Sequence, residues 1–120
     1  MQLHLRLLAT VLFFGCAAFA QNEKPKSMHQ KNPKQPVQVV EASCGQCKFK
    51  LTGKSCDLAV RIDGKAYFVD GTKIDDHGDA HAEDGFCEAI RKAEVQGKVV
   101  DGRFKATYFK LLPEPKAGQQ

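Results

Sequence analysis

The stretch L-A-V-R-I-D-G-K-A-Y-F-V-D, from Leu58 to Asp70, decides the predicted fold. Apolar side chains alternate with other side chains on both sides of Asp63-Gly64, at positions Leu58, Val60, Ile62, Tyr67 and Val69. A period of two is typical of strands that bury one face. Asp and Gly tolerate the positive backbone angles of a two-residue turn. The stretch therefore predicts a β-hairpin.

A second hairpin is predicted near the end of the chain. Valines and a glycine alternate up to Asp101-Gly102, and aromatic and small apolar residues alternate after it; these positions are Val95, Gly97, Val99, Phe104, Ala106 and Tyr108. Valines also cluster directly after Pro36, which marks the start of a first strand running toward Cys44. Five strands are therefore expected in total.

Between the third and fourth strands, the spacing predicts one short helix over Gly85–Ala93. Phe86, Ile90 and Ala93 recur at helical spacing, and basic residues at 91 and 92 suit the negative end of a helix dipole. The predicted fold is mainly β with one short helix, a five-stranded OB-like small barrel of order β-β-β-α-β-β. An α+β sandwich is the alternative, because periodicity does not fix strand pairing.

The first twenty residues have the features of a secretory signal peptide. A basic start precedes an apolar run from Leu7 to Gly15, and Ala18-Phe19-Ala20 supplies small residues for cleavage after Ala20. The run is too short for a membrane span, which needs about 20 residues. Lipidation at Cys16 is the alternative, although the preceding phenylalanines match that signal poorly. An exported protein, periplasmic or extracellular, is predicted.

The rest of the chain divides into a linker, one domain and a tail. Residues 21–36 are polar and predict a disordered linker, residues 37–113 a single domain, and residues 114–120 a flexible tail. The domain holds twelve basic and twelve acidic side chains. It lacks the excess positive charge of a nucleic-acid binder. We expect a monomer whose partner is a protein or a metal ion.

Four cysteines, Cys44, Cys47, Cys56 and Cys87, remain after the predicted cleavage. An even number of cysteines in a short exported chain favours disulfides, which would reinforce a domain with a small apolar core. Four thiols allow three pairings, and the spacing does not choose between them. A disulfide-stabilised protein-interaction domain is therefore one hypothesis.

The same four thiols could instead hold a metal ion such as zinc. Cys44 and Cys47 have the spacing of a zinc knuckle, and the other two cysteines would complete a tetrahedral site. His77 and His81 are additional candidate ligands, because a helical turn would place both imidazoles on one face. They lie in an acidic segment, residues 75–84, that otherwise predicts a solvated loop.

A third hypothesis is thiol-disulfide exchange, with Cys44 attacking and Cys47 resolving. Such chemistry needs the first thiol at a helix start, where its anion is stabilised. The residues after Cys47, Phe49-Lys-Leu-Thr-Gly53, do not predict a helix, and no proline lies between Pro36 and Pro113. We therefore favour a binding module over an enzyme.

Extended motifs carry a family resemblance. The segments are C-G-Q-C-K-F, G-K-S-C-D-L-A-V-R-I-D-G-K-A-Y-F-V-D-G, D-D-H-G-D-A-H, G-F-C and A-E-V-Q-G-K-V-V-D-G-R-F, within residues 40–112. They are similar to a family of small exported bacterial proteins with a domain of unknown function. A more distant resemblance, to short exported OB-like proteins with a C-x-x-C, C, H, C pattern, implies that the cysteines and His77 act as one set.

Overall fold

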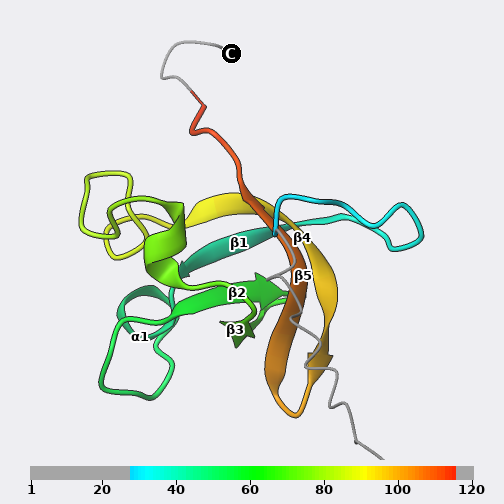
Figure 1. The fold of residues 1–120 in the computed structure, drawn as a ribbon. Coiled ribbons are helices and arrows are strands. Elements are labelled where there is room, and N and C mark those ends of the chain that lie inside the picture. Colours follow the sequence, from blue (N-terminus) through cyan, green and yellow to red (C-terminus); the bar gives the residue numbers. More distant parts are fainter. Residues whose placement is uncertain (1–27, 116–120) are drawn as a thin grey trace, which may run out of the picture.

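The computed structural model describes residues 28–115, and these form a closed five-stranded barrel (Figure 1). The strands are β1 (Gln38–Cys44), β2 (Leu58–Ile62), β3 (Lys65–Asp70), β4 (Arg91–Val100) and β5 (Arg103–Leu111). Their order around the barrel is β1-β2-β3-β5-β4, and β4 pairs with β1 to close it. The pairs are antiparallel except β3 with β5, which is parallel. The predicted OB-like barrel is confirmed.

Both predicted hairpins are present, with the predicted turns. Asp63 and Gly64 have φ of 49° and 81°, and Asp101 and Gly102 have φ of 52° and 74°. Turns with positive φ at both central residues match the twist of paired strands. The turns therefore fix the register of β2 with β3 and of β4 with β5.

One glycine of the second hairpin is required by close packing between strands. The β4–β5 register shifts between Gln96 and Gly97, which marks a bulge in β4. A Cβ on Gly97 would lie 2.2 Å from the Lys105 carbonyl oxygen. A side chain at this position would therefore force the two strands apart.

The apolar core fills the barrel and continues under one loop. Inward-facing side chains of the strands are almost fully buried, among them Val60, Val95, Phe104 and Phe109. Phe86, from the segment between β3 and β4, is 2 % exposed and belongs to the same cluster. The loop before β4 is thus anchored to the core.

The predicted helix over Gly85–Ala93 is wrong. Residues 85–89 form turns, and β4 starts at Arg91, where Arg91 pairs with Ala42 and Ala93 with Val40 of β1. Ile90 is 42 % exposed, although a core-facing helix would have buried it. Pairing with β1 satisfies the backbone of these residues, and this tertiary contact outweighs the helical spacing.

Two short helical turns occur elsewhere in residues 28–115. The four-residue helix α1 (Gly45–Lys48) follows β1, and the 3-10 turn η1 (Ile74–His77) follows β3. The expectation that residues 49–53 form no helix is confirmed, but α1 itself was not predicted, and Cys44 is its N-cap. The helix is too short to produce a periodic pattern.

The described part of the predicted linker, residues 28–36, contacts the barrel. The buried amide of Gln96 donates to the carbonyl oxygens of Asn32 and Gln35 and accepts from the Asn32 backbone N–H. The Phe109 N–H donates to the Met28 carbonyl. These contacts fix the path of the chain into β1. The predicted signal peptide and the tail beyond residue 115 lie outside the described residues.

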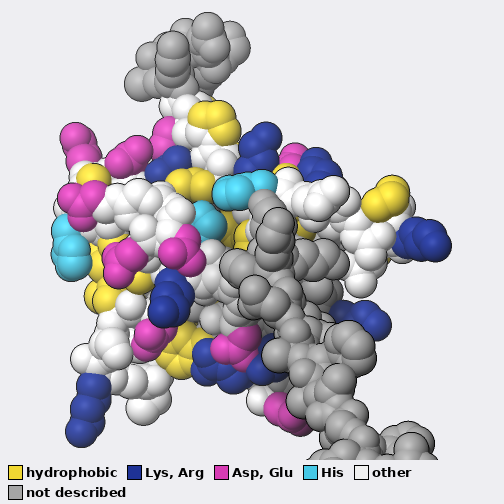
Figure 2. Space-filling model, viewed as in Figure 1, with side chains coloured by type: hydrophobic (Ala, Val, Ile, Leu, Met, Phe, Trp, Pro, Cys, Tyr) yellow, Lys and Arg dark blue, Asp and Glu magenta, His cyan; other side chains and the backbone are white. Residues whose placement is uncertain are grey.

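Buried Arg91, at the start of β4, ties two loops to the barrel. Its guanidinium donates to the backbone carbonyls of Asp84 (2.7 Å) and Leu112 (2.9 Å) and forms ion pairs with the carboxylates of Asp84 and Glu114. The acidic loop between β3 and β4 is therefore held at its C-terminal end. Figure 2 shows the acidic side chains of this region gathered at one edge of the molecule.

Candidate metal centre

The four cysteine sulfurs converge in one place. Each Sγ lies within 4.8 Å of the others, although the residues come from the end of β1, from α1, from the approach to β2 and from the loop before β4. Among residues 28–115, this is the one group of at least three His, Cys, Asp or Glu side chains arranged so closely. The set could hold a metal ion.

Within the group, one sulfur contacts two others. Cys56 Sγ lies 2.7 Å from Cys44 Sγ and 2.6 Å from Cys87 Sγ. No bond joins any two of these four sulfurs in the structure. A sulfur can form a disulfide with one partner only, so this arrangement is a single four-sulfur group and not two separate pairs. Around zinc, tetrahedral sulfurs at ~2.3 Å from the ion would lie about 3.8 Å apart. Binding would require the closest sulfurs to separate by about 1 Å.

Helix α1 determines the position of Cys44 relative to Cys47. The Cys47 backbone N–H donates to Cys44 Sγ over 3.3 Å, and the Phe49 N–H closes the helix on the Gly45 carbonyl. Gly45 packs against β3, where an added Cβ would lie 2.6 Å from the Phe68 ring. The C-G-Q-C motif thus forms one tight turn whose second residue must be small.

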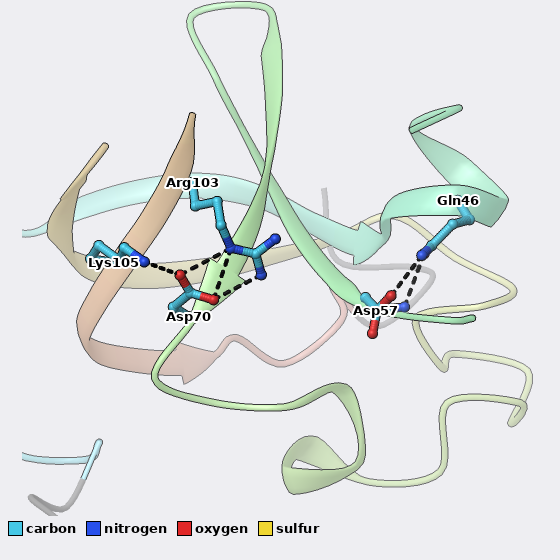
Figure 3. Close-up of polar contacts among 5 residues, drawn as sticks. All are labelled: Gln46, Asp57, Asp70, Arg103 and Lys105. Atoms are coloured by element: carbon cyan, nitrogen blue, oxygen red, sulfur yellow. Dashed lines mark hydrogen bonds and ion pairs between the residues drawn. The ribbon is translucent and has the colours of Figure 1, made fainter. Parts of the chain in front are cut away.

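Cys56 is positioned by the residue that follows it. The Gly45 N–H donates to the Asp57 carbonyl, and the Gln46 side chain pairs with Asp57 twice (Figure 3). Gln46 Nε2 donates to Asp57 Oδ2 over 2.7 Å, and the Asp57 N–H donates to Gln46 Oε1 over 2.9 Å. The Cys44 thiol also donates to Gln46 Oε1, over 3.7 Å. Gln46 therefore connects α1 to the loop that carries Cys56.

Cys87 is positioned through the buried side chain of Ser43. Ser43 Oγ contacts the carbonyl oxygens of Phe86 and Ala89, at 2.6 and 2.8 Å. The Cys44 N–H donates to the Phe86 carbonyl, and the Cys87 N–H donates to the Ala80 carbonyl. The loop that replaces the predicted helix thus lies against the end of β1, with its cysteine beside Cys44.

The thiols differ in their readiness to ionise. Burial opposes ionisation of Cys44, but hydrogen bonds from Cys56 and Cys47 outweigh it and lower the pKa of Cys44. The neighbouring Cys44 side chain raises the pKa of Cys47. Burial, followed by the hydrogen bonds with Cys44 and Cys87, raises the pKa of Cys56. A cation that binds as four thiolates would therefore have to displace thiol protons against the raised pKa values of Cys47 and Cys56.

The two histidines predicted as additional ligands lie outside the four-sulfur group. The His77 ring packs against Phe109 and Phe86, with centroids 4.5 and 6.1 Å away, and its Nε2 hydrogen-bonds Thr72 Oγ1 at 2.9 Å. Burial lowers the pKa of His77, so the ring is neutral at pH 7. His81 is exposed, and its backbone N–H donates to Asp79.

Thiol-disulfide exchange needs an exposed attacking thiol, and the exposure of the two thiols is the reverse of this. Cys44, the predicted attacking thiol, is fully buried, whereas Cys47, the predicted resolving thiol, is exposed. A disulfide substrate could reach Cys47 but not Cys44. Although Cys44 has the helix N-cap position that lowers thiol pKa values, its burial makes it a poor nucleophile for a protein disulfide.

Sequence reasoning missed the residues that bring the cysteines together. Ser43 and Gln46 lie within or beside the C-G-Q-C motif, and Asp57 follows Cys56 directly. Their adjacency to cysteines was the available signal. Their hydrogen bonds depend on chain segments up to 46 residues away, which periodicity does not reveal.

Another charged group lies on the outer face of the barrel. Asp70 on β3 accepts hydrogen bonds from Arg103 and Lys105 of β5 (Figure 3). Arg103 above all lowers the pKa of Asp70, to about 2. Because β3 and β5 form the parallel pair between the two hairpins, this group reinforces the junction of one hairpin with the other.

No helix among residues 28–115 is long and apolar enough to cross a membrane. Comparison of the chain with curated proteins and with solved structures finds no match. A family model, however, matches residues 38–112, from the start of β1 to the end of β5. The chain therefore belongs to the family of unknown function DUF6370.

Proposed function

We propose that this protein is an exported metal-binding module in which Cys44, Cys47, Cys56 and Cys87 hold one Zn²⁺ ion. The observation that carries the proposal is the convergence of all four sulfurs within 4.8 Å, with Cys56 in contact with two neighbours. Four thiolates in a tetrahedral set are typical zinc ligands, and soft thiolate sites also accept Cu(I) or iron.

Hydrogen bonds around the site support the proposal. The N–H groups of Cys44, Cys47 and Cys87 are satisfied, and Gln46 and Ser43 hold the loops that carry Cys56 and Cys87. A metal site needs such supporting contacts, because they hold the ligands close together before the ion arrives. In a domain this small, bound zinc would contribute on the order of 10 kcal/mol to folding.

The alternative is a domain stabilised by two disulfides that presents a protein-binding surface. All three pairings lie within reach in the observed cluster, and an oxidising compartment would favour them. Each disulfide would contribute about 2 to 4 kcal/mol. This alternative predicts no bound metal and no reactive thiol in protein taken from its own compartment.

The test is the composition of mature protein isolated from its native compartment. Cell fractionation and the N-terminal peptide mass locate the protein and its cleavage site, predicted after Ala20. Elemental analysis then measures zinc, copper and iron, while thiols are alkylated with and without denaturant and chelator. The proposal expects one zinc per chain and four thiols that alkylate fully only after chelation. Two disulfides without metal would establish the alternative instead.

A further inference from the structure

The four sulfurs are unequally exposed to solvent. Cys44 is fully buried, Cys56 and Cys87 are half-buried, and Cys47 is exposed. A purely structural zinc site is closed, with the ion enclosed by its four ligands. Here one corner of the tetrahedron lies at the surface of the molecule, on the four-residue helix α1.

Three of the four ligands are held by contacts to other parts of the fold. Cys44 ends β1 and its N–H donates to Phe86, the Cys87 N–H donates to Ala80, and Cys56 precedes Asp57, which Gln46 and Gly45 hold. The Cys47 N–H donates to Cys44 Sγ, within the same turn. The backbone N–H of the exposed ligand thus bonds within its own turn and not to another part of the barrel.

We propose that Cys47 is the exchange ligand of the site, through which the ion passes to or from a thiolate-bearing partner. The inference rests on the proposed metal binding and specifies its use, which is transfer of the ion and not only stabilisation of the fold. In the exchange step, an incoming thiolate forms a bond to the ion as the bond to Cys47 Sγ breaks. The oxidation states are unchanged, and Cys47 leaves as a thiolate that takes a proton from water.

Charge around Cys47 indicates the kind of partner. The segment from Gly45 to Cys56 carries Lys48, Lys50 and Lys54 and no carboxylate, and Lys50 and Lys54 are exposed. Asp57, the acid that directly follows this segment, accepts a hydrogen bond from Gln46. A basic segment of this kind attracts a negatively charged partner that delivers or receives the metal ion, and it stabilises the ionised thiol of that partner. The partner is therefore a thiolate ligand set with negative charge around it.

The test uses the full-length mature chain loaded with Co²⁺, whose thiolate absorption bands report the occupied site. Two small dithiols serve as acceptors, dimercaptosuccinate with two carboxylates and neutral dithiothreitol. We expect the rate of Co²⁺ removal to rise in proportion to the concentration of either dithiol. A Lys50→Glu/Lys54→Glu variant should lose about threefold to tenfold in the rate with dimercaptosuccinate at low salt and little with dithiothreitol. A Lys110→Glu variant, altered on β5, serves as the charge control.

A second measurement identifies the exposed ligand directly. Brief alkylation of the metal-loaded protein, followed by peptide mass mapping, should modify Cys47 at least tenfold faster than the other three cysteines. A removal rate that does not depend on dithiol concentration, or first modification at Cys56 or Cys87, would overturn the exchange role while leaving metal binding intact. A chain that binds no Co²⁺ or Zn²⁺ would instead overturn the proposed function, and the inference with it.

Discussion

Replacing Gln46 with alanine tests whether the pairing of α1 with Asp57 prepares the site for metal. The change removes two hydrogen bonds, of 2.7 and 2.9 Å, that hold the loop carrying Cys56 against α1, together with the longer contact of the Cys44 thiol with Gln46 Oε1. Each such bond contributes about 1 kcal/mol net. Because Asp57 is exposed, we expect the two hydrogen bonds together to contribute about 1 to 2 kcal/mol to holding the loop in place. Without the pairing, the ion itself must order the loop, so this free energy is lost from binding.

A loss of this size corresponds to a roughly fivefold to thirtyfold weaker affinity. The measurement is Zn²⁺ titration of the reduced chain in competition with a chelator of known affinity. Lys48→Ala is the matched control, because it shortens another α1 side chain and leaves the pairing with Asp57 in place. If Gln46→Ala and Lys48→Ala bind Zn²⁺ equally tightly, the Gln46–Asp57 pairing does not prepare the site.

Three further predictions concern the thiols, the buried imidazole and the anchored N-terminal segment. Cys44→Ser should abolish tight Zn²⁺ binding, whereas Cys47→Ser should retain a weaker three-thiolate site. Equal Zn²⁺ affinities of the two variants in chelator competition would contradict the argument from the burial of Cys44 and the exposure of Cys47. His77 has a lowered pKa, so the folded chain takes up its proton less readily than the unfolded chain, and stability should decline as the pH falls below about 6.5. Thermal melting from pH 7.5 to 5 should show a smaller decline for His77→Asn; an identical decline would refute the assignment to His77. Gln96→Leu removes three hydrogen bonds to residues 32–35 and should cost about 2 kcal/mol in urea unfolding. Lys98→Ala, on the same strand, is its control, and equal stability of the two variants would mean that the anchoring contributes nothing.

The parts of the fold that could be predicted are those whose signal is local. Asp63-Gly64 and Asp101-Gly102 specify their turns through residues that tolerate positive φ, and the flanking alternation then sets two hairpins. The spacing of Phe86, Ile90 and Ala93 was misleading for the opposite reason. Ala93 pairs with Val40, a residue 53 positions earlier, and no local pattern reports that pairing.

The candidate site likewise contains residues that could be identified from the sequence and residues whose role depends on distant parts of the chain. The cysteines were identifiable because metal coordination and disulfide formation both require thiols, so residue type alone made them candidates. His77 had the right chemistry, but its ring packs in the core region against Phe109. Ser43 and Gln46 are common polar residues whose role depends on where the loops of Cys87 and Cys56 fold back.

The anchoring by Gln96 fixes the place on the barrel surface where residues 32–35 lead into β1. Residues 32–35 lie beside β4 and β5 on one side of the barrel, and α1 with its cysteines lies on the other (Figure 1). The turn that carries Cys47 is therefore separated from this anchored segment by the width of the barrel. A second molecule could approach Cys47 without contacting residues 32–35.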